Sequence, residues 1–427
     1  MALCGPSYSG TMPGSAVEIS QGLTLFEAYD LSLKRSEEIA TKQELINEAQ
    51  GHFYRALGSI LPKASFVMTH FEQEVDSGGG EFGGENATSN AVRRTTPQKK
   101  FVFSQPLFQG FREFAAIQGA GAEKGQRSYE KQRAEELLFM DVVNAFYGLI
   151  QANKGTGIAE SIRKALDERV KELEGRVKLG RSRDSELQTA IADLKVVEYE
   201  LRIARKIEAI SKELLEFYIG QKIEERLVDD AVSEEALFDI DQYLERSLNR
   251  SDYLAAEKAQ LFAEQNVVVA QSGLFPTARL DGNYYTQRVG FQSGIDWDLF
   301  LTIDVPLFKG ETFGAIKEAW AQRQIAELNT ERTGREIRLD IGEAYEELKS
   351  SRDGEKLLFE AAEASKKSYE LQVQEYRLNL VNNLDVLDAL RQYENVERAY
   401  NQAHYESKKN YWKFKVAIGE KIKGSAK

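Results

Sequence analysis

The sequence predicts a mainly α-helical protein with a small β part, in which one unit of long helices and two strands occurs twice. Residues 297–305 alternate strictly between apolar and mostly polar side chains, as a strand with one apolar and one wet face does. A very long helical pattern begins directly after this strand. The same strand and long helix occur about 200 residues earlier in the chain.

Matched motifs define the duplication. Ser-Gln-Pro-Leu-Phe-Gln-Gly at 104–110 matches Asp-Val-Pro-Leu-Phe-Lys-Gly at 304–310, an offset of 200 residues. Further matches pair 144–146 with 343–345, 218–220 with 417–419, 61–62 with 275–276 and 34–36 with 249–251. The order of the motifs is the same in both halves, so the chain is one structural unit duplicated.

Composition excludes several classes of protein. No run in the 427 residues approaches eighteen apolar side chains, which excludes a transmembrane helix. The formal net charge of −12 argues against nonspecific binding to nucleic acid. His52, His70 and His404 lie far apart and lack ligand spacing, so we predict no metal site and no cofactor. No nucleophile and base stand in a recognisable pattern, so we predict no enzyme activity.

The first 22 residues are expected to form a disordered leader. They hold neither a basic flank nor an apolar core, so they are not an intact signal peptide. Cys4 is the only cysteine, which excludes an intrachain disulfide. Leu3 before Cys4 fits a lipid-attachment site poorly, and an incidental thiol is the favoured reading.

The first structural repeat spans 23–220. It opens with a helix over 24–60, where Thr24 and Glu27 form a capping box. A strand over 63–75, a Gly-rich loop over 76–95 and a returning strand over 99–105 follow. A helix over 107–179, a break at 180–183 and a return helix over 184–219 complete the repeat.

An acidic linker, 221–238, leads to the second repeat, 239–420, and a tail, 421–427. The second repeat is expected to contain a helix over 239–272, strands over 277–288 and 296–305 joined by a short loop, a helix over 307–380, a break at 382–383, and a return helix over 383–418. In each repeat, two half-length helices can stack end to end against one full-length helix, which predicts a rod of four helical columns with the strands at one end.

Four strands are too few to close a barrel, and open strand edges do not persist in lipid. Two chains would supply eight strands, and three would supply twelve, which is wide enough for a channel. A trimer is the smallest assembly with a use for the polar strand face, formed by Arg279, Asp281, Asn283, Asp298, Thr302 and Asp304. Ala64, Phe66, Met68 and His70 are assigned to the outward face. The expected fold is therefore a long-helix α-barrel plus a trimeric twelve-stranded transmembrane β-barrel.

The chain resembles the TolC family of bacterial outer-membrane efflux and secretion channels. The resemblance rests on the duplicated Pro-Leu-Phe-x-Gly motif, the endings Tyr-Ile-Gly220 and Ala-Ile-Gly419, and residues 376–389, and it covers roughly 23–421. It implies a homotrimer in the outer membrane of a Gram-negative bacterium, with a helical tunnel extending into the periplasm. It also implies a passive exit duct of an efflux pump or type I secretion system, with a periplasmic adaptor and an inner-membrane transporter of RND, ABC or MFS type as partners.

The resemblance places the periplasmic entrance at the second helix-helix turn. Asp385 and Asp388 lie three residues apart, hence on one helix face, and match aspartates that line the family's channel constriction. Glu186 occupies the place of Asp385 in the first repeat, and Tyr376 matches a tyrosine of the closed state. Val381 stands where the family has an arginine, so the family's locking salt bridge is not expected in the same form.

Local structure offers alternative explanations for these residues. Asn383 is expected to cap the return helix, and Asp385 would then favour the positive end of the helix dipole. Asp388 lies beyond the first turn and could belong to a solvated face. Leu179, Gly180, Leu378 and Asn379 match the family's adaptor-contact tips, and a simple helix-breaking turn explains the same residues.

Two other functions fit parts of the pattern. A soluble periplasmic or cytoplasmic coiled-coil scaffold would have continuous heptads and no strands. A secreted helical pore-forming toxin would need long apolar hairpins, which this sequence does not contain. The alternating strands favour the channel.

Overall fold

The computed structural model describes residues 22–74, 95–229, 237–245, 247–289 and 294–420. Cys4, the tail and most of the predicted leader and Gly-rich loop lie outside these residues. The chain divides into two compact units: unit 1 contains Met1–Ser36, Glu135–Ile240 and Ile341–Lys427, and unit 2 contains Glu37–Ala134 and Asp241–Asp340. Among the helices of the described residues, none has the length and apolar character needed to cross a membrane.

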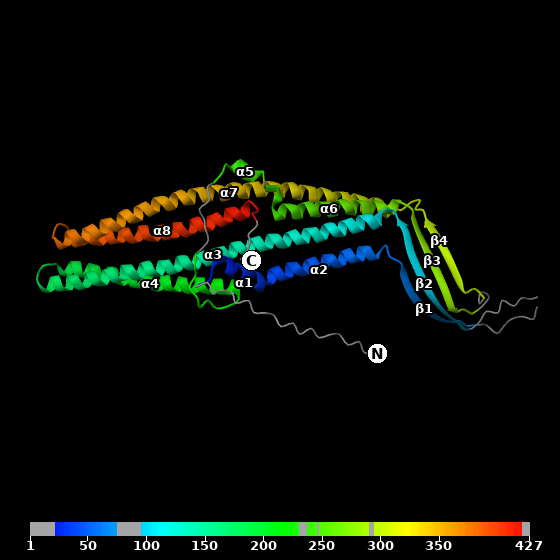
Figure 1. The fold of residues 1–427 in the computed structure, drawn as a ribbon, viewed down its shortest axis with the longest axis horizontal. Helices are drawn as coiled ribbons and strands as arrows, with labels where there is room; N and C mark the ends of the chain where they lie inside the picture. Colours follow the sequence, from blue (N-terminus) through cyan, green and yellow to red (C-terminus); the bar gives the residue numbers. More distant parts are fainter. Residues whose placement is uncertain (1–21, 75–94, 230–236, 246, 290–293, 421–427) are drawn as a thin grey trace, which may run out of the picture. The chain divides into compact units, whose positions relative to one another are not determined.

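Unit 2 contains an antiparallel sheet of four strands in the order β1-β2-β3-β4 (Figure 1). The strands are β1 (Lys63–Glu72), β2 (Thr95–Gln109), β3 (Thr277–Gln287) and β4 (Trp297–Asp304). Because β1 and β4 form the two edges, each has one side without a strand partner in the described chain. β2 is longer than the predicted 99–105, since it pairs on both sides and a register shift between Pro106 and Phe108 accommodates the proline.

The register separates the side chains of the sheet into two faces. Leu299, Leu301 and Ile303 of β4 lie opposite Gly282, Leu280 and Ala278 of β3. The alternate residues Asp298, Phe300 and Thr302 lie opposite Asn283, Asp281 and Arg279, so the polar set predicted from the sequence shares one face. Phe66 of β1 lies opposite Phe101 and Met68 opposite Lys99, with Phe101 in turn opposite Tyr284, so Phe66 and Met68 belong to the apolar face as expected.

The polar face carries its own hydrogen bonds. Asn283 Nδ2 donates to Asp298 Oδ1 at 2.7 Å, and Tyr285 OH donates to the other oxygen of this carboxylate at 2.9 Å. Ser104 Oγ donates to Asp281 Oδ1 at 2.6 Å. These bonds link three strands on the side of the sheet that the sequence assigns to water.

Unit 2 also holds α2 (Glu37–Gly58), α6 (Ser251–Gln271) and the N-terminal parts of α3 (Arg112–Lys178) and α7 (Gly310–Arg377). The two long helices begin later than the predicted 107 and 307. In α3 the reason is that residues 107–109 remain in β2 and the chain then turns at Gly110 and Phe111, whose φ angles are 66° and 70°. The long helices themselves are confirmed.

The predicted helix over 24–60 is wrong at one point, because it is two helices, α1 (Leu25–Arg35) and α2, separated by Ser36 with an extended ψ of 115°. The predicted helix over 239–272 is interrupted in the same way, giving α5 (Ile240–Leu244), a 3₁₀ turn at Ser247–Asn249 and α6. The interruptions fall at the matched Arg-Ser pairs of the two repeats. Arg250 is buried beside its break and pairs with Asp252 and Asp340 at 2.6 and 2.8 Å, which favours this backbone over a straight helix.

Unit 1 contains α1, α4 (Asp184–Ile219), α8 (Asn383–Ala417) and the C-terminal parts of α3 and α7. Figure 1 shows α4 running beside α3, and α8 beside α7. Both return helices have the predicted bounds to within one residue. The capping box of Thr24 and Glu27 is confirmed, with the Thr24 amide donating to Glu27 Oε2 at 2.9 Å. An aromatic cluster of Tyr29, Phe139 and Trp412 joins α1, α3 and α8.

Candidate functional site

The two long helices end in the same kind of turn within unit 1. Gly180 and Asn379 have φ angles of +67° and +58°, a region that glycine adopts freely and asparagine tolerates. The amide of Arg181 donates to the carbonyl of Arg176 at 2.8 Å, and the amide of Leu380 donates to that of Glu375 at 2.9 Å. These bonds satisfy carbonyl groups at the helix ends, so backbone geometry explains the residue types at 180 and 379.

Leucine side chains project from both turns. Leu179 and Leu378 are each 69% exposed, and Leu380 and Leu384 are exposed beside them. Arg176 Nη1 donates to Asn379 Oδ1 at 3.5 Å, a long contact that brings the turn of one repeat to the turn of the other. The turns therefore present apolar side chains to solvent on a backbone that its own hydrogen bonds fix.

Tyr376 lies inside the helix packing. Its ring is 6% exposed and belongs to a cluster that includes Leu166, Leu173 and Val386. The guanidinium carbon of Arg169 lies 3.6 Å from the ring centroid, and that of Arg176 lies 4.3 Å from it. Tyr376 thus binds two arginines of α3 by cation–π contact, and its ring does not line open space in this conformation.

Arg169 connects the two repeats through Asn383. Its Nε donates to Asn383 Oδ1 at 2.7 Å, and its Nη1 pairs with Glu172 at 2.9 Å. Arg169 is 7% exposed and Asn383 is 2% exposed. The remaining nitrogen, Nη2, has no partner among the described residues. Sequence reasoning missed Arg169, because nothing local to α3 marks a contact with a residue 214 positions away.

The expectation that Asn383 caps α8 is wrong. Asn382 is the cap, and its Oδ1 accepts from the amide of Asp385 at 3.1 Å. The Asp385 carboxylate accepts in return from the Asn382 amide at 3.0 Å. The capping box uses residue 382 because residue 383 is turned inward toward Arg169. Asp385 therefore stabilises the N-terminus of α8 as a member of the capping box and as an acidic residue at the positive end of the helix dipole.

The other two acidic residues of the predicted entrance also have local partners. Asp388 is exposed and pairs with Arg391 at 3.1 Å. The Glu186 carboxylate accepts a hydrogen bond from the Ser182 hydroxyl. Within the described chain, each of the three carboxylates of Glu186, Asp385 and Asp388 thus has a partner of its own.

Two arginines of α8 hold α4 at positions one heptad apart. Arg391 Nη2 lies 2.6 Å from Asp193, and Arg398 Nη2 lies 2.8 Å from Glu200. Arg398 also pairs with Glu394 at 2.6 Å, so one guanidinium serves two carboxylates. These charged contacts join the return helices of the two repeats, and the sequence analysis did not anticipate them.

The contacts shift the ionisation of their members. The bond to Asp193 is the main cause that raises the pKa of Arg391. Burial, followed by repulsion from Glu394, raises the pKa of Glu200, while Arg398 lowers it. The pair of carboxylates thus carries more negative charge than its single arginine neutralises.

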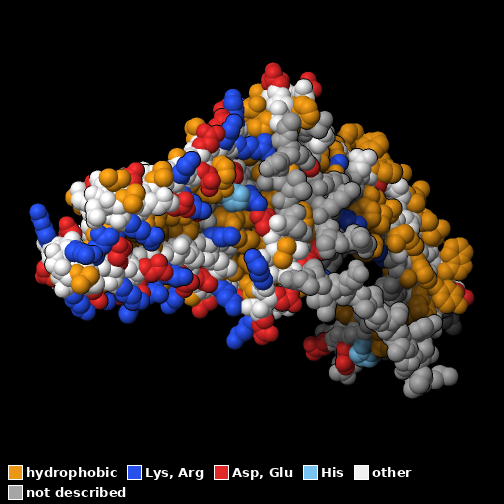
Figure 2. Space-filling view, turned by 60° about the vertical axis from the view of Figure 1, so that its left-hand side comes forward, with side chains coloured by type: hydrophobic (Ala, Val, Ile, Leu, Met, Phe, Trp, Pro, Cys, Tyr) orange, Lys and Arg blue, Asp and Glu red, His pale blue; other side chains and the backbone are white. Residues whose placement is uncertain are grey.

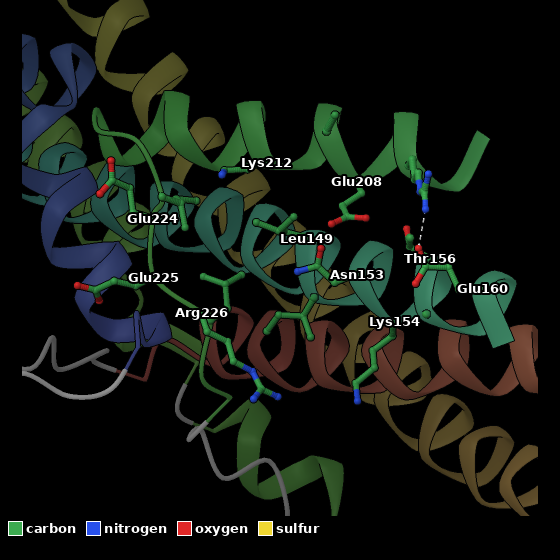
Figure 3. Close-up of a pocket in the computed structure, with 16 residues that line it drawn as sticks. Leu149, Asn153, Lys154, Thr156, Glu160, Glu208, Lys212, Glu224, Glu225 and Arg226 are labelled. Carbon is green, nitrogen blue, oxygen red and sulfur yellow. Dashed lines mark hydrogen bonds and ion pairs between the residues drawn. The ribbon is translucent and has the colours of Figure 1, made fainter. Parts of the chain in front are cut away.

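A cavity of about 930 Å³ lies between α3, α4 and the linker residues 223–227 (Figure 3). Lys154, Arg226, Glu208 and Glu224 are among its charged lining groups, and Arg205 pairs with Glu160 at 2.8 Å on its wall. The lining carries both signs of charge, and nothing in it selects one class of ligand.

The apolar face of the sheet is exposed in the single chain. Figure 2 shows hydrophobic side chains gathered over the strands. The exposed hydrophobic residues of the strands on this face are Phe66, Met68, Phe101, Phe103, Tyr284, Trp297, Leu299, Leu301 and Ile303. An apolar face of this extent on one side, with a hydrogen-bonded polar face on the other, needs an apolar medium to cover it.

Comparison with known proteins agrees with this geometry. Residues 243–420 match the family model described as outer membrane efflux protein. Outer membrane protein TolC of Vibrio cholerae is 23% identical over 337 residues, which cover 74% of this chain and 75% of that protein.

Solved structures share the fold. The outer membrane protein VceC of Vibrio cholerae has a TM-score of 0.79 at 20% identity, covering 92% of this chain and 96% of VceC. The CmeC outer membrane channel of Campylobacter jejuni has a TM-score of 0.78 at 16% identity, covering 100% of this chain and 95% of CmeC. The mainly α fold with four strands per chain is thus confirmed. Residues 243–420 thus match the outer membrane efflux protein family, and the resemblance of this chain to the TolC family is confirmed.

Proposed function

We propose that this protein is the outer-membrane channel of a tripartite efflux pump or a type I secretion system. It is a passive exit duct of a Gram-negative outer membrane that extends into the periplasm, and it catalyses no reaction itself. Its inner-membrane transporter, of RND, ABC or MFS type, supplies the energy. The single observation that carries this proposal is the two-faced sheet, apolar and exposed on one side and polar on the other.

The sheet cannot meet this function as a single copy. Its edge strands β1 and β4 would leave unpaired backbone groups in lipid, which is too costly to persist. Three copies supply twelve strands and close the ring with a polar interior. The polar residues Arg279, Asp281, Asn283, Asp298 and Thr302 then line water, and the apolar face meets lipid.

A row of side chains on α4 also supports assembly. Val196, Tyr199, Ile207, Ile210, Leu214 and Phe217 are exposed, and together with the half-buried Ile203 they recur at spacings of three and four residues. The opposite face of α4 is the one that is buried within the chain, as at Ala190, Leu194 and Leu201. Such a row is a helix-packing seam, and a neighbouring copy in the ring would cover it.

The turn residues are proposed to serve the partners and the entrance. Leu179, Gly180, Leu378 and Asn379 form the tips that contact a periplasmic adaptor, supported by their exposure and by their fixed turn geometry. Asp385, Asp388 and Glu186 place acidic groups near these turns in each copy, where a constriction would concentrate cations. Tyr376 stabilises the helices next to this entrance through its cation–π contacts with Arg169 and Arg176.

The alternative of a coiled-coil scaffold accounts for the helices alone. It offers no use for a sheet whose exposed face is rich in Phe, Leu and Trp. Mass measurement of the detergent-solubilised protein tests the proposal: three copies of the 48.2 kDa chain are expected. A monodisperse monomer or dimer would overturn it.

A further inference from the structure

A buried acidic side chain lines an apolar cavity in unit 2, where β2 ends and α3 begins. The cavity has a volume of about 220 Å³. Its lining is apolar apart from Gln109 and Glu113, and it includes Ile60, Phe108 and Ile117. Glu113 is only 8% exposed. A carboxylate in such surroundings needs hydrogen-bond donors close to both of its oxygens.

The Glu113 carboxylate has a donor at one oxygen only. Its Oε1 accepts from the amide of Gln109 at 3.3 Å. Its Oε2 is shielded from solvent, and no group among the described residues donates to it. Glu113 lies in the first turn of α3, where the helix dipole favours a negative charge. Because a carboxylate oxygen without a donor lowers stability, the site is one donor short.

The size and lining of the cavity restrict what can supply this donor. Its volume of about 220 Å³ is far more than one water needs, but it is below the roughly 300 Å³ at which sites for drug-sized ligands begin. Calcium and magnesium require about six or more oxygen ligands, and the apolar walls do not offer them. A small cationic group that carries N–H donors fits both the space and the charge.

The cavity adjoins the apolar face of the sheet. Phe108, which lines it, lies opposite Ala278 of β3, and Ala278 lies opposite Ile303 on the apolar face. Leu107 and Phe114, also in the lining, are 54% and 63% exposed. In the proposed channel this face meets lipid hydrocarbon, so the end of the face at which α3 begins lies at the level of the lipid headgroups.

We propose that this cavity binds the headgroup ammonium of phosphatidylethanolamine, with Glu113 Oε2 as its acceptor. The acyl chains of the lipid would lie along the apolar face of the sheet. This proposal rests on the channel described under the proposed function and adds a specific lipid to it. The ammonium supplies three N–H donors and a charge that complements the carboxylate. The headgroup of phosphatidylcholine carries three methyl groups on its nitrogen instead and has no N–H to donate.

The second repeat lacks this site. At the offset of 200 residues, Phe313 stands in the place of Glu113 and Lys317 in the place of Ile117. The first repeat therefore has the carboxylate without a lysine, and the second has the lysine without the carboxylate. Ile117→Lys would place an ammonium four residues after Glu113 on the same helix, in the order that favours ion pairing. This variant would supply the missing donor from the chain itself.

Native mass spectrometry of the detergent-solubilised trimer tests the site. Phosphatidylethanolamine and phosphatidylcholine with identical acyl chains are added in turn, and the lipid bound to the trimer is measured. The wild type should bind phosphatidylethanolamine about tenfold more tightly, as a charge-assisted hydrogen bond allows. Glu113→Gln keeps an acceptor for the Gln109 amide but removes the charge, so it should lose this preference. Ile117→Lys should lose it as well, because its own ammonium occupies the site.

Glu311→Gln is the matched control. Glu311 is an exposed acidic residue in the first turn of α7, so its replacement removes the same charge at the equivalent place in the second repeat. This variant should keep the preference for phosphatidylethanolamine. Equal losses in Glu311→Gln and Glu113→Gln would reduce the effect to overall charge and overturn the site.

Three further results would overturn the lipid site. The first is a preference that survives both Glu113→Gln and Ile117→Lys. The second is displacement of phosphatidylethanolamine by hexylammonium at equal concentration, which would assign the cavity to soluble amines. The third is a wild-type trimer without any preference between the two lipids, and that result leaves the proposed channel standing. A wild-type protein that is not trimeric would overturn the proposed function and, with it, the lipid site.

Discussion

Replacing Asn383 by alanine should loosen the turn between α7 and α8. The Arg169 guanidinium is 7% exposed, and Asn383 is the acceptor of its Nε at 2.7 Å. The change leaves a buried charged donor without a partner, which costs roughly 1–3 kcal/mol. Arg169→Met leaves only the neutral Asn383 amide unpaired and removes a buried charge, so it should cost less.

Amide hydrogen exchange of the detergent-solubilised protein over residues 376–387 measures this opening. A loss of about 1–3 kcal/mol corresponds to roughly 5- to 150-fold faster exchange in Asn383→Ala. The double variant Arg169→Met/Asn383→Ala should exchange more slowly than Asn383→Ala, since it no longer buries a guanidinium whose Nε has lost its acceptor. Lys171→Met, on the exposed side of α3, is the control and should change the rate by less than about 0.5 kcal/mol.

Two results would refute this reasoning. If the effects of the two single substitutions simply add in the double variant, Arg169 and Asn383 are not energetically coupled. If Arg169→Met accelerates exchange more than Asn383→Ala, the cation–π contact with Tyr376 outweighs the hydrogen bond.

The remaining predictions concern charge, pH and assembly. Asp385→Asn should reduce cation selectivity in bilayer recordings more than Asp388→Asn, because Asp388 is already paired with Arg391; equal effects would contradict this. Because the pKa of Glu200 is raised in the folded protein, its ionised form destabilises the packing of α4 against α8. This destabilisation is present above the folded pKa and is lost as the pH falls toward the ordinary value of 4.5. The protection of α8 amides from hydrogen exchange, corrected for the intrinsic exchange rate, should therefore rise on acidification. Glu200→Gln should abolish this pH dependence; the same pH dependence in the variant would exclude Glu200 as its cause. Phe217→Ala, in the exposed row of α4, should lower the temperature at which the trimer dissociates on a gel by several degrees, whereas Phe313→Ala on α7 should not; equal shifts would remove the special role of that row.

The strands and the long helices follow directly from sequence patterns. Period-two alternation over 297–305 and long three-four spacing identify strands and helices without tertiary information. Both return helices were placed within one residue, because a helix-breaking turn and a glycine ending bound α4 and α8. The repeat was equally visible, since its motifs consist of Pro, Gly and aromatic residues with local backbone roles.

The interruptions and the side-chain partners were not predictable in the same way. Ser36 lies within a sequence that favours helix throughout, and its extended backbone coincides with the boundary between two compact units. Adjacent Asn382 and Asn383 are both suitable caps, and only the buried contact with Arg169 determines which of them faces inward. The Arg391–Asp193 contact likewise depends on how α4 and α8 approach one another, which no local pattern records.

The resemblance to the TolC family predicts entrance residues but does not indicate their partners. Tyr376 matches a tyrosine of the family, whereas Val381 stands where the family has an arginine. The structure supplies two other arginines, Arg169 and Arg176, from the first repeat. Their ring contacts became visible only once the two repeats were packed together.

Conductance across a planar lipid bilayer tests the central claim most directly. The purified trimer should produce discrete, uniform conductance steps, and their ion selectivity should favour cations. The role of this chain as an exit duct would be contradicted if protein of confirmed trimeric mass inserts into the bilayer and yields no conductance steps. That result would have to hold at every applied voltage and salt concentration, for the wild type and for the Asp385→Asn/Asp388→Asn variant alike.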